Sequence, residues 1–277
     1  MSLLIVQGAS IAAPQIAELF SRVGASSFHT PRPGVVHFSP ATRWEGLPDW
    51  CRQHRLDFAY LDRPRQLKEF RLLAMDMDST LISIECIDEI ADFAGVKPQV
   101  AAITEAAMRG ELDFPGALRQ RVALLKGLPE ATLQRVFDER LRLSPGAEAL
   151  LAAARQAGLK TLLVSGGFTY FVHRLGRQLG LDFTLANELE FQDGQLTGTV
   201  RGAIVDAQAK ADQVASVCRE LGCSTQQALV LGDGANDLKM MGLAGFSVAF
   251  RAKPVVQQQA SAALNFAGLD GVLNWLE

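Results

Sequence analysis

The chain has 277 residues, of which 48% are hydrophobic and 21% are charged. This length indicates about two domains, and the composition excludes a disordered or fibrous protein. The 27 Lys and Arg residues against 30 Asp and Glu residues leave a formal net charge of −3. A charge so close to zero argues against nucleic acid or an acidic membrane as partner, so any anion must be bound by a local site.

The N-terminal 70 residues are expected to form a small α+β unit. Its predicted strands are Leu3–Gln7, Val35–Phe38 and Asp57–Leu61, and its predicted helices are Pro14–Val23 and Leu47–Arg55. The charged stretch Asp62–Lys68 contains a proline and is typical of a linker.

From Arg71 onward, short apolar strands alternate with helices, a pattern that predicts a parallel sheet covered on both faces. The expected strands are Arg71–Met75, Lys160–Val164, Phe183–Ala186, Ala228–Leu231, Phe246–Ala249 and Ala262–Phe266. The expected helices are Pro145–Gly158, Tyr170–Leu179 and Lys210–Leu221, and the stretch from Ile87 to about Leu143 is helical throughout. A hairpin is predicted around Asp193-Gly194.

Sequence features of membrane insertion or export are not found. No apolar window reaches the 18 or so residues of a spanning helix, and the N-terminus does not resemble a signal peptide. The four cysteines, Cys51, Cys86, Cys218 and Cys223, have neither C-x-x-C nor zinc-ligand spacing. We therefore expect reduced thiols in a cytoplasmic protein without a membrane partner.

Polar residues follow three of the predicted strands. They are Asp76-Met77-Asp78-Ser79-Thr80, Ser165-Gly166-Gly167 and Gly232-Asp233-Gly234-Ala235-Asn236-Asp237. Because ligands bind at the carboxyl ends of parallel strands, Asp76, Asp78, Asp233 and Asp237 are expected in one crevice. Side chains two apart on a strand share a face, so the first two are expected to point into this crevice from related directions.

This acidic crevice predicts a cation and an anion together. Four neighbouring carboxylates repel one another strongly unless a cation compensates them. All-oxygen ligands suit Mg²⁺. Ser165 and the amides of Gly166 and Gly167 stand before a predicted helix, where N–H groups and the helix dipole favour an anion such as phosphate.

These motifs, with a lysine between the last two of them, resemble the haloacid dehalogenase-like hydrolases over about residues 71–277. The segment around Glu85 and the segment 118–126 are most similar to members that hydrolyse O-phospho-L-serine. The resemblance implies a Rossmann-like α/β core at 71–81 and 144–277, and a helical cap at 82–143. Residues 1–70 would form the additional small domain.

The resemblance also implies roles for individual residues. Asp76 would be the nucleophile that forms an aspartyl-phosphate, Asp78 the general acid and base, and Lys210 the partner of the phosphoryl group. Mg²⁺ would be held by Asp76, the carbonyl of Asp78 and Asp233, with Asp237 in the same set. Substrate contacts would come from Ser165, Gly166, Asn236, Glu85, Arg121, Phe114 and Met108. Glu85 would bind the ammonium of phosphoserine and Arg121 its carboxylate, in the last step of serine biosynthesis.

Other interpretations stay open at this point. The same chemistry fits another small phosphate, or transfer of the phosphoryl group to a second alcohol. A different class is an amino-acid-binding regulatory protein with an inactive hydrolase core. Residues 1–70 fit an ACT-like ligand-binding domain, a dimerisation unit or a docking unit equally well, and the chain is expected to be a monomer or a homodimer.

Overall fold

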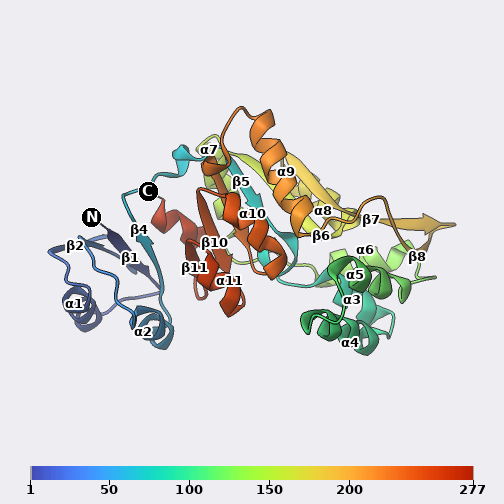
Figure 1. Ribbon diagram of the computed structural model, residues 1–277, viewed down its shortest axis with the longest axis horizontal. Helices are drawn as coiled ribbons and strands as arrows, with labels where there is room; N and C mark the ends of the chain where they lie inside the picture. Colours follow the sequence, from blue (N-terminus) through green and yellow to red (C-terminus); the bar gives the residue numbers. More distant parts are fainter. Residues whose placement is uncertain (1, 277) are drawn as a thin grey trace.

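The computed structural model describes residues 2–276 and contains one continuous 11-stranded sheet (Figure 1). The strands are β1 (Leu3–Gln7), β2 (Ser27–Arg32), β3 (Val35–Ser39), β4 (Asp57–Leu61), β5 (Leu72–Met75), β6 (Lys160–Phe168), β7 (Phe183–Gln192), β8 (Gln195–Arg201), β9 (Ala228–Gly232), β10 (Phe246–Phe250) and β11 (Ala262–Leu264). The helices are α1 (Ala13–Arg22), α2 (Leu47–His54), α3 (Cys86–Phe93), α4 (Lys97–Met108), α5 (Phe114–Ala123), α6 (Glu130–Arg135), α7 (Ala147–Gln156), α8 (Thr169–Leu179), α9 (Ala207–Glu220), α10 (Leu238–Leu243) and α11 (Pro254–Gln259).

The predicted parallel sheet is confirmed in the central part of the molecule. Strands β11, β10, β9, β5, β6 and β7 lie side by side in that order and pair in parallel. Leu73 and Met75 of β5 point into one hydrophobic cluster, and Leu72 and Ala74 into another on the opposite face. The apolar run of β5 is therefore buried on both sides, as expected of a strand in a doubly covered sheet.

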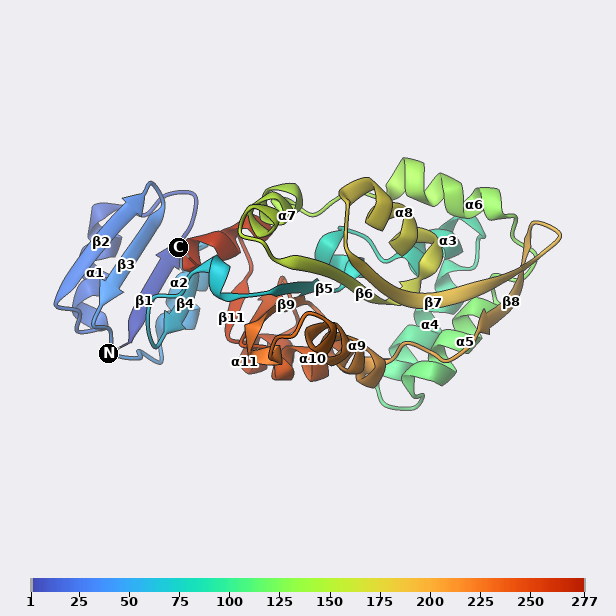
Figure 2. The same ribbon diagram turned by 90° about the horizontal axis from the view of Figure 1, so that it is seen from above.

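The small N-terminal unit has its own helices but extends the same sheet. Its strands pair antiparallel in the order β2-β3-β1-β4, and β4 then pairs with β11 of the core. The buried carboxylate of Asp57 in β4 accepts hydrogen bonds from the backbone N–H groups of Asn265, Phe266 and Ala267, at 2.7 to 3.3 Å. These contacts hold the unit against the core, at one end of the molecule (Figure 2).

Helices α3 to α6 form a helical segment at the opposite end of the molecule (Figures 1 and 2). The chain leaves the core after β5 and returns before α7, and the two crossings lie together because the backbone of Ser83 donates to Arg142 at 3.0 Å. The β7–β8 hairpin also reaches this segment, since Leu196 exchanges backbone hydrogen bonds of 2.8 Å with Gly127 and Leu128. The division into residues 1–70, the core and a cap at 82–143 agrees with this arrangement and stays a prediction.

Three details of the local structure differ from the expectations. Strand β2 was not predicted. Strand β6 continues through Ser165–Gly167 to Phe168, beyond its predicted end at Val164. Strand β7 is one continuous strand, whereas the sequence predicted a strand at Phe183–Ala186 and a separate strand leading into the hairpin. Within residues 2–276, no helix is both long and apolar enough to cross a membrane.

Candidate active site

Asp76 follows directly after β5 and starts a tight turn. Its backbone N–H donates to Leu231 of the neighbouring strand at 3.0 Å, which extends the sheet pairing by one residue. One carboxylate oxygen, Oδ1, accepts from the N–H of Met77 at 2.7 Å, and the side chain is only 5% exposed. Sheet pairing and turn together hold the carboxylate in place.

Asp78 lies in the same turn and not on the strand, because β5 ends at Met75. The expectation that it shares a strand face with Asp76 was wrong in this respect. The following residue, Ser79, has a left-handed backbone (φ 55°), which bends the chain sharply. Oδ1 of Asp78 accepts from the N–H of Cys86 at 3.0 Å. Its enclosed position, and then the charge of Glu85, raise the pKa of Asp78 to about 7.

Lys210 in the first turn of α9 connects the two acidic segments. Its Nζ lies 2.8 Å from Oδ2 of Asp76 and 2.8 Å from Oδ1 of Asp237, and the side chain is fully buried. Burial alone would lower the pKa of Lys210, but the two carboxylates outweigh this and raise it. The two carboxylates therefore favour the charged form of the ammonium beside Asp76.

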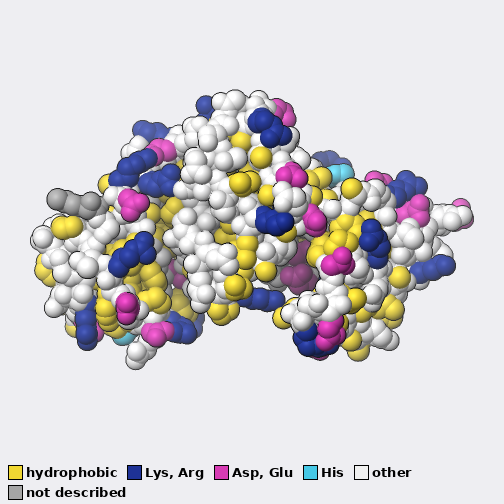
Figure 3. Space-filling model, viewed as in Figure 1, with side chains coloured by type: hydrophobic (Ala, Val, Ile, Leu, Met, Phe, Trp, Pro, Cys, Tyr) yellow, Lys and Arg dark blue, Asp and Glu magenta, His cyan; other side chains and the backbone are white. Residues whose placement is uncertain are grey.

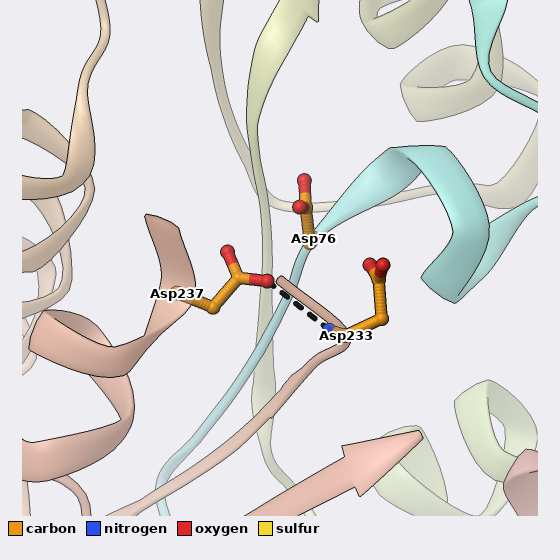
Figure 4. Close-up of side chains that lie close together, drawn as sticks. All are labelled: Asp76, Asp233 and Asp237. Atoms are coloured by element: carbon orange, nitrogen blue, oxygen red, sulfur yellow. Dashed lines mark hydrogen bonds between the residues drawn. The ribbon is translucent and has the colours of Figure 1, made fainter. Parts of the chain in front are cut away.

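Asp76, Asp233 and Asp237 place carboxylate oxygens within 4.8 Å of one another (Figure 4). Burial, and then repulsion by Asp237, raise the pKa of Asp76 well above its ordinary value despite Lys210. The same two causes raise the pKa of Asp233 to about 7. Three carboxylates beside one ammonium leave excess negative charge, and a hard divalent cation with oxygen ligands would balance it.

The hydrogen bonds show which oxygens of these carboxylates are already occupied by protein donors. Both oxygens of Asp237 accept from the protein: Oδ1 from Lys210, and Oδ2 from the N–H groups of Asp233 and Gly234 at 3.1 and 3.0 Å. Asp233 accepts from the hydroxyl of Thr80 at 3.0 Å through Oδ1. Among residues 2–276 no group donates to its other oxygen, which is therefore the one best placed for a cation. Asn236 is half-buried in the same turn.

The segment Ser165–Gly167 closes another side of the site. The buried Ser165 hydroxyl accepts from the N–H of Gly167 at 2.8 Å. A Cβ atom on Gly167 would lie 2.6 Å from Oδ2 of Asp78, and one on Gly166 would lie 2.9 Å from the ring of Phe114. Only glycine allows this approach of the backbone to Asp78.

The helical segment contributes the remaining predicted residues. Glu85 accepts from the hydroxyl of Ser79 at 2.6 Å, and Arg121 is half-buried with Asp88, Glu85 and Asp78 as its charged neighbours. Acidic side chains line the recess between this segment and the core (Figure 3). Met108 is 66% exposed at the end of α4, and its Sδ lies 3.7 Å from Nζ of Lys253, so it contributes only to the rim.

The structure thus brings the three strand-end motifs and Lys210 together, as predicted from the sequence. Sequence reasoning missed Ser79 and Thr80, which hold Glu85 and Asp233 respectively. Both belong to the first motif, but a hydroxyl within a motif does not reveal its partner. The geometry defines a buried carboxylate held by a lysine, beside a second carboxyl that titrates near neutrality, in an acidic site suited to a divalent cation.

Comparison with known proteins agrees with this class of site. The family model of the haloacid dehalogenase-like hydrolases matches residues 73–242, more than half of the chain, and the chain belongs to this family. Within the family it is similar to the phosphoserine phosphatase of Polaromonas sp. (strain JS666). The two are 56% identical over 213 residues, covering 75% of this chain and 90% of the relative.

Solved structures extend the similarity to the whole chain. A HAD family hydrolase from Salmonella enterica serovar Typhi has a TM-score of 0.91 at 31% identity, covering 100% of this chain and 99% of that one. A probable phosphoserine phosphatase from Vibrio cholerae has a TM-score of 0.85 at 38% identity, covering 99% and 86% of the two chains. The N-terminal unit is therefore part of a fold that these proteins share.

Proposed function

We propose that this protein hydrolyses O-phospho-L-serine to L-serine and phosphate, through a phosphoryl group carried by Asp76. The observation that carries the proposal is the placement of Asp76 2.8 Å from the buried ammonium of Lys210, beside Asp78 and the Ser165–Gly167 segment. The phosphoserine phosphatases at 56% and 38% identity support the choice of substrate. Removal of the phosphoryl group from phosphoserine is the last step of serine biosynthesis.

The carboxylate of Asp76 is the proposed nucleophile. Hydrolysis of phosphate monoesters is extremely slow without a catalyst, and a covalent intermediate divides it into two easier steps. Asp76 attacks phosphorus and serine leaves; water then attacks the aspartyl-phosphate and regenerates the carboxylate. Lys210 opposes the rise in the pKa of Asp76, orients its carboxylate, and offers positive charge to the phosphoryl oxygens.

Asp78 is the proposed general acid and base. A pKa of about 7 lets the carboxyl exist in both forms near neutral pH. In its acid form Asp78 donates a proton to the leaving serine oxygen. In the second step the resulting carboxylate takes a proton from the attacking water.

Asp76 and Asp233 would hold Mg²⁺ together with the backbone carbonyl of Asp78, and Asp237 would support them through Lys210 and the turn at Asp233. When bound, Mg²⁺ would reduce the repulsion between the nucleophile and the phosphate dianion. Ser165, the N–H of Gly166 and Asn236 would contact the phosphoryl oxygens. This set of roles is carried over from the resemblance and fits the hydrogen bonds described above.

Glu85 and Arg121 would select phosphoserine. Glu85 would bind the ammonium, and Arg121 would bind the carboxylate through two N–H groups. Phe114 packs beside Gly166 and would border the same pocket, with Met108 at its edge. The helical segment would act as a cap that excludes water during the first step. We place the reaction in the cytoplasm, where the four free thiols stay reduced.

The test is a panel of phosphate esters, assayed with Mg²⁺ and with EDTA. Phosphate release from L-phosphoserine is expected to exceed release from phosphothreonine, sugar phosphates and p-nitrophenyl phosphate, and to stop in EDTA. Equal rates on all four esters would disprove the assignment of the substrate. Full activity in EDTA would disprove the assignment of a metal.

A further inference from the structure

The side chain of Asn187 joins two parts of the active site without facing the substrate crevice itself. It is 1% exposed, near the middle of β7. Its Nδ2 donates to the backbone carbonyl of Gly166 at 2.7 Å, and its Oδ1 accepts from the backbone N–H of Val205 at 2.8 Å. Both polar ends of the carboxamide are therefore used, and both partners are backbone groups.

The two partners belong to segments with different roles in the proposed reaction. Gly166 is the middle residue of the Ser165–Gly167 segment, which is proposed to bind the phosphoryl group. Val205 directly precedes Asp206, whose carboxylate caps α9 by accepting from the N–H groups of Gln208 and Ala209 at 2.9 Å. Lys210 lies in the first turn of that helix. Asn187 therefore sets the separation between the Ser165–Gly167 segment and the start of α9, the helix that carries Lys210.

The carboxamide makes this pair of contacts with its two ends. One end must donate to a carbonyl and the other must accept from an N–H; a carboxylate cannot donate and an aliphatic side chain can do neither. Because the site is buried, either partner left alone would lose its hydrogen bond without gaining one from water. The pairing between β6 and β7 is irregular between Val164 and Phe168, so at this place the side chain of Asn187 binds the Gly166 carbonyl.

We propose that Asn187 is a positioning residue for catalysis: it holds the Ser165–Gly167 segment of β6 and the N-terminus of α9 at a fixed separation, so that Gly166 and Lys210 converge on one phosphoryl group. The proposal rests on the proposed phosphatase function. Asn187 acts through Gly166 and Val205 and touches no substrate atom. Glu85 and Arg121 lie in the helical segment and do not depend on this link.

The proposal predicts that substitution of Asn187 weakens the binding of phosphate but not the binding of serine. Asn187→Leu removes both hydrogen bonds and keeps the branch point at Cγ, and Asn187→Asp replaces the donor to Gly166 with an oxygen. The matched control is Thr161→Val, which removes buried hydrogen bonds of 2.9 and 3.1 Å to Asp182 at the other end of β6. Four readouts are compared: the melting transition, kcat and KM for L-phosphoserine, binding of inorganic phosphate by calorimetry in Mg²⁺, and competitive inhibition by L-serine.

Asn187→Leu is expected to lower kcat by about 100-fold, the size of effect expected from a misplacement of about 1 Å. Binding of inorganic phosphate should weaken about tenfold or more, and inhibition by L-serine should stay unchanged. Asn187→Asp should fall between Asn187→Leu and the unsubstituted protein. Thr161→Val should melt at a lower temperature while its phosphate affinity and kcat stay those of the unsubstituted protein.

A folded Asn187→Leu variant that keeps its phosphate affinity and kcat would overturn the proposal. So would a parallel loss of phosphate and serine affinity, which indicates general distortion. If neither Asn187 variant folds, the residue serves folding and the proposal is wrong. Failure of the proposed function is distinguishable, because in that case the unsubstituted protein itself does not hydrolyse L-phosphoserine, whereas the calorimetric comparison needs no turnover.

Discussion

The ammonium of Lys210 lies 2.8 Å from Oδ2 of Asp76, and both side chains are buried where the central strands end. The two residues are far apart in the chain: one follows β5, and the other begins α9. The same ammonium also contacts Asp237 at 2.8 Å. One lysine thus compensates two buried carboxylates, and both the stability and the activity of the site should depend on it.

Substitution of this lysine tests that dependence. Lys210→Met leaves Asp76 and Asp237 without their buried partner, which is expected to lower the free energy of unfolding by about 3–5 kcal/mol without metal. Turnover should fall by about 100-fold or more, because a charged donor to the phosphoryl group is lost. Urea unfolding in EDTA and initial rates in Mg²⁺ measure the two effects. An unfolding free energy equal to that of the unsubstituted protein would contradict the proposed compensation.

The close approach of the Gly167 backbone to Asp78 predicts that a larger residue at this position lowers activity. In Gly167→Ala the new methyl group would lie 2.6 Å from Oδ2 of Asp78 and must displace it. We expect kcat to fall by about 100-fold, while circular dichroism shows a folded protein. The control is Gly242→Ala in α10, where a Cβ atom meets nothing within 4 Å. Equal activity of the two variants would show that the position of Asp78 is not critical.

The proposed recognition of the serine part of the substrate by Arg121 predicts that replacing this residue lowers activity on L-phosphoserine. Arg121→Ala should lower kcat/KM for L-phosphoserine by about 10- to 100-fold, the range for a hydrogen bond to a charged group. The same variant should leave kcat/KM for p-nitrophenyl phosphate unchanged. Arg119→Ala is the matched control, because two residues correspond to about 200° around a helix, so Arg119 points away from Arg121. Equal losses on both esters would contradict the assignment of Arg121.

The raised pKa of Asp233 predicts how pH and metal act on stability. An unfolded Asp has a pKa of about 3.9, whereas folding raises the pKa of Asp233 to about 7. The metal-free folded protein therefore holds this proton more tightly than the unfolded chain does. Its contribution to stability is greatest below the unfolded pKa and is lost as pH rises through about 7.

The proposed Mg²⁺ would bind the ionised carboxylates, so it should raise the melting temperature more at about pH 8 than at about pH 5. Thermal unfolding in Mg²⁺ and in EDTA at both pH values measures this difference. A larger increase at the lower pH would contradict the assignment of Asp233 to the metal site.

The central fold was predictable because its signals are local. Strand β5 is an uninterrupted apolar run that stops at an acidic residue, and α9 carries a regular apolar face. Strand β2 was not predictable in this way: its sequence, Ser-Phe-His-Thr-Pro-Arg, lacks a clear alternation, and it is exposed along nearly its whole length. It is held by pairing with β3, which is a tertiary effect.

In the candidate site, too, residues held by tertiary contacts could not be predicted from local signals. Asp76 and Asp233 were predicted from motifs, because strand ends of a parallel sheet must meet at one edge, whereas Lys210 was predicted from the family resemblance. Asn187 was not, because it falls between two predicted elements and its partners, Gly166 and Val205, are distant in sequence. The exposure of Met108 was likewise unforeseen, since it depends on where α4 ends relative to the core.

The central claim is that Asp76 carries the phosphoryl group of L-phosphoserine. The most direct measurement is mass spectrometry of the protein quenched in acid during turnover, followed by reduction of the acyl phosphate and peptide mapping. The account predicts one phosphoryl group per chain, placed on Asp76, and none in a folded Asp76→Asn variant. A phosphoryl group on another residue, or normal turnover by Asp76→Asn, would contradict it.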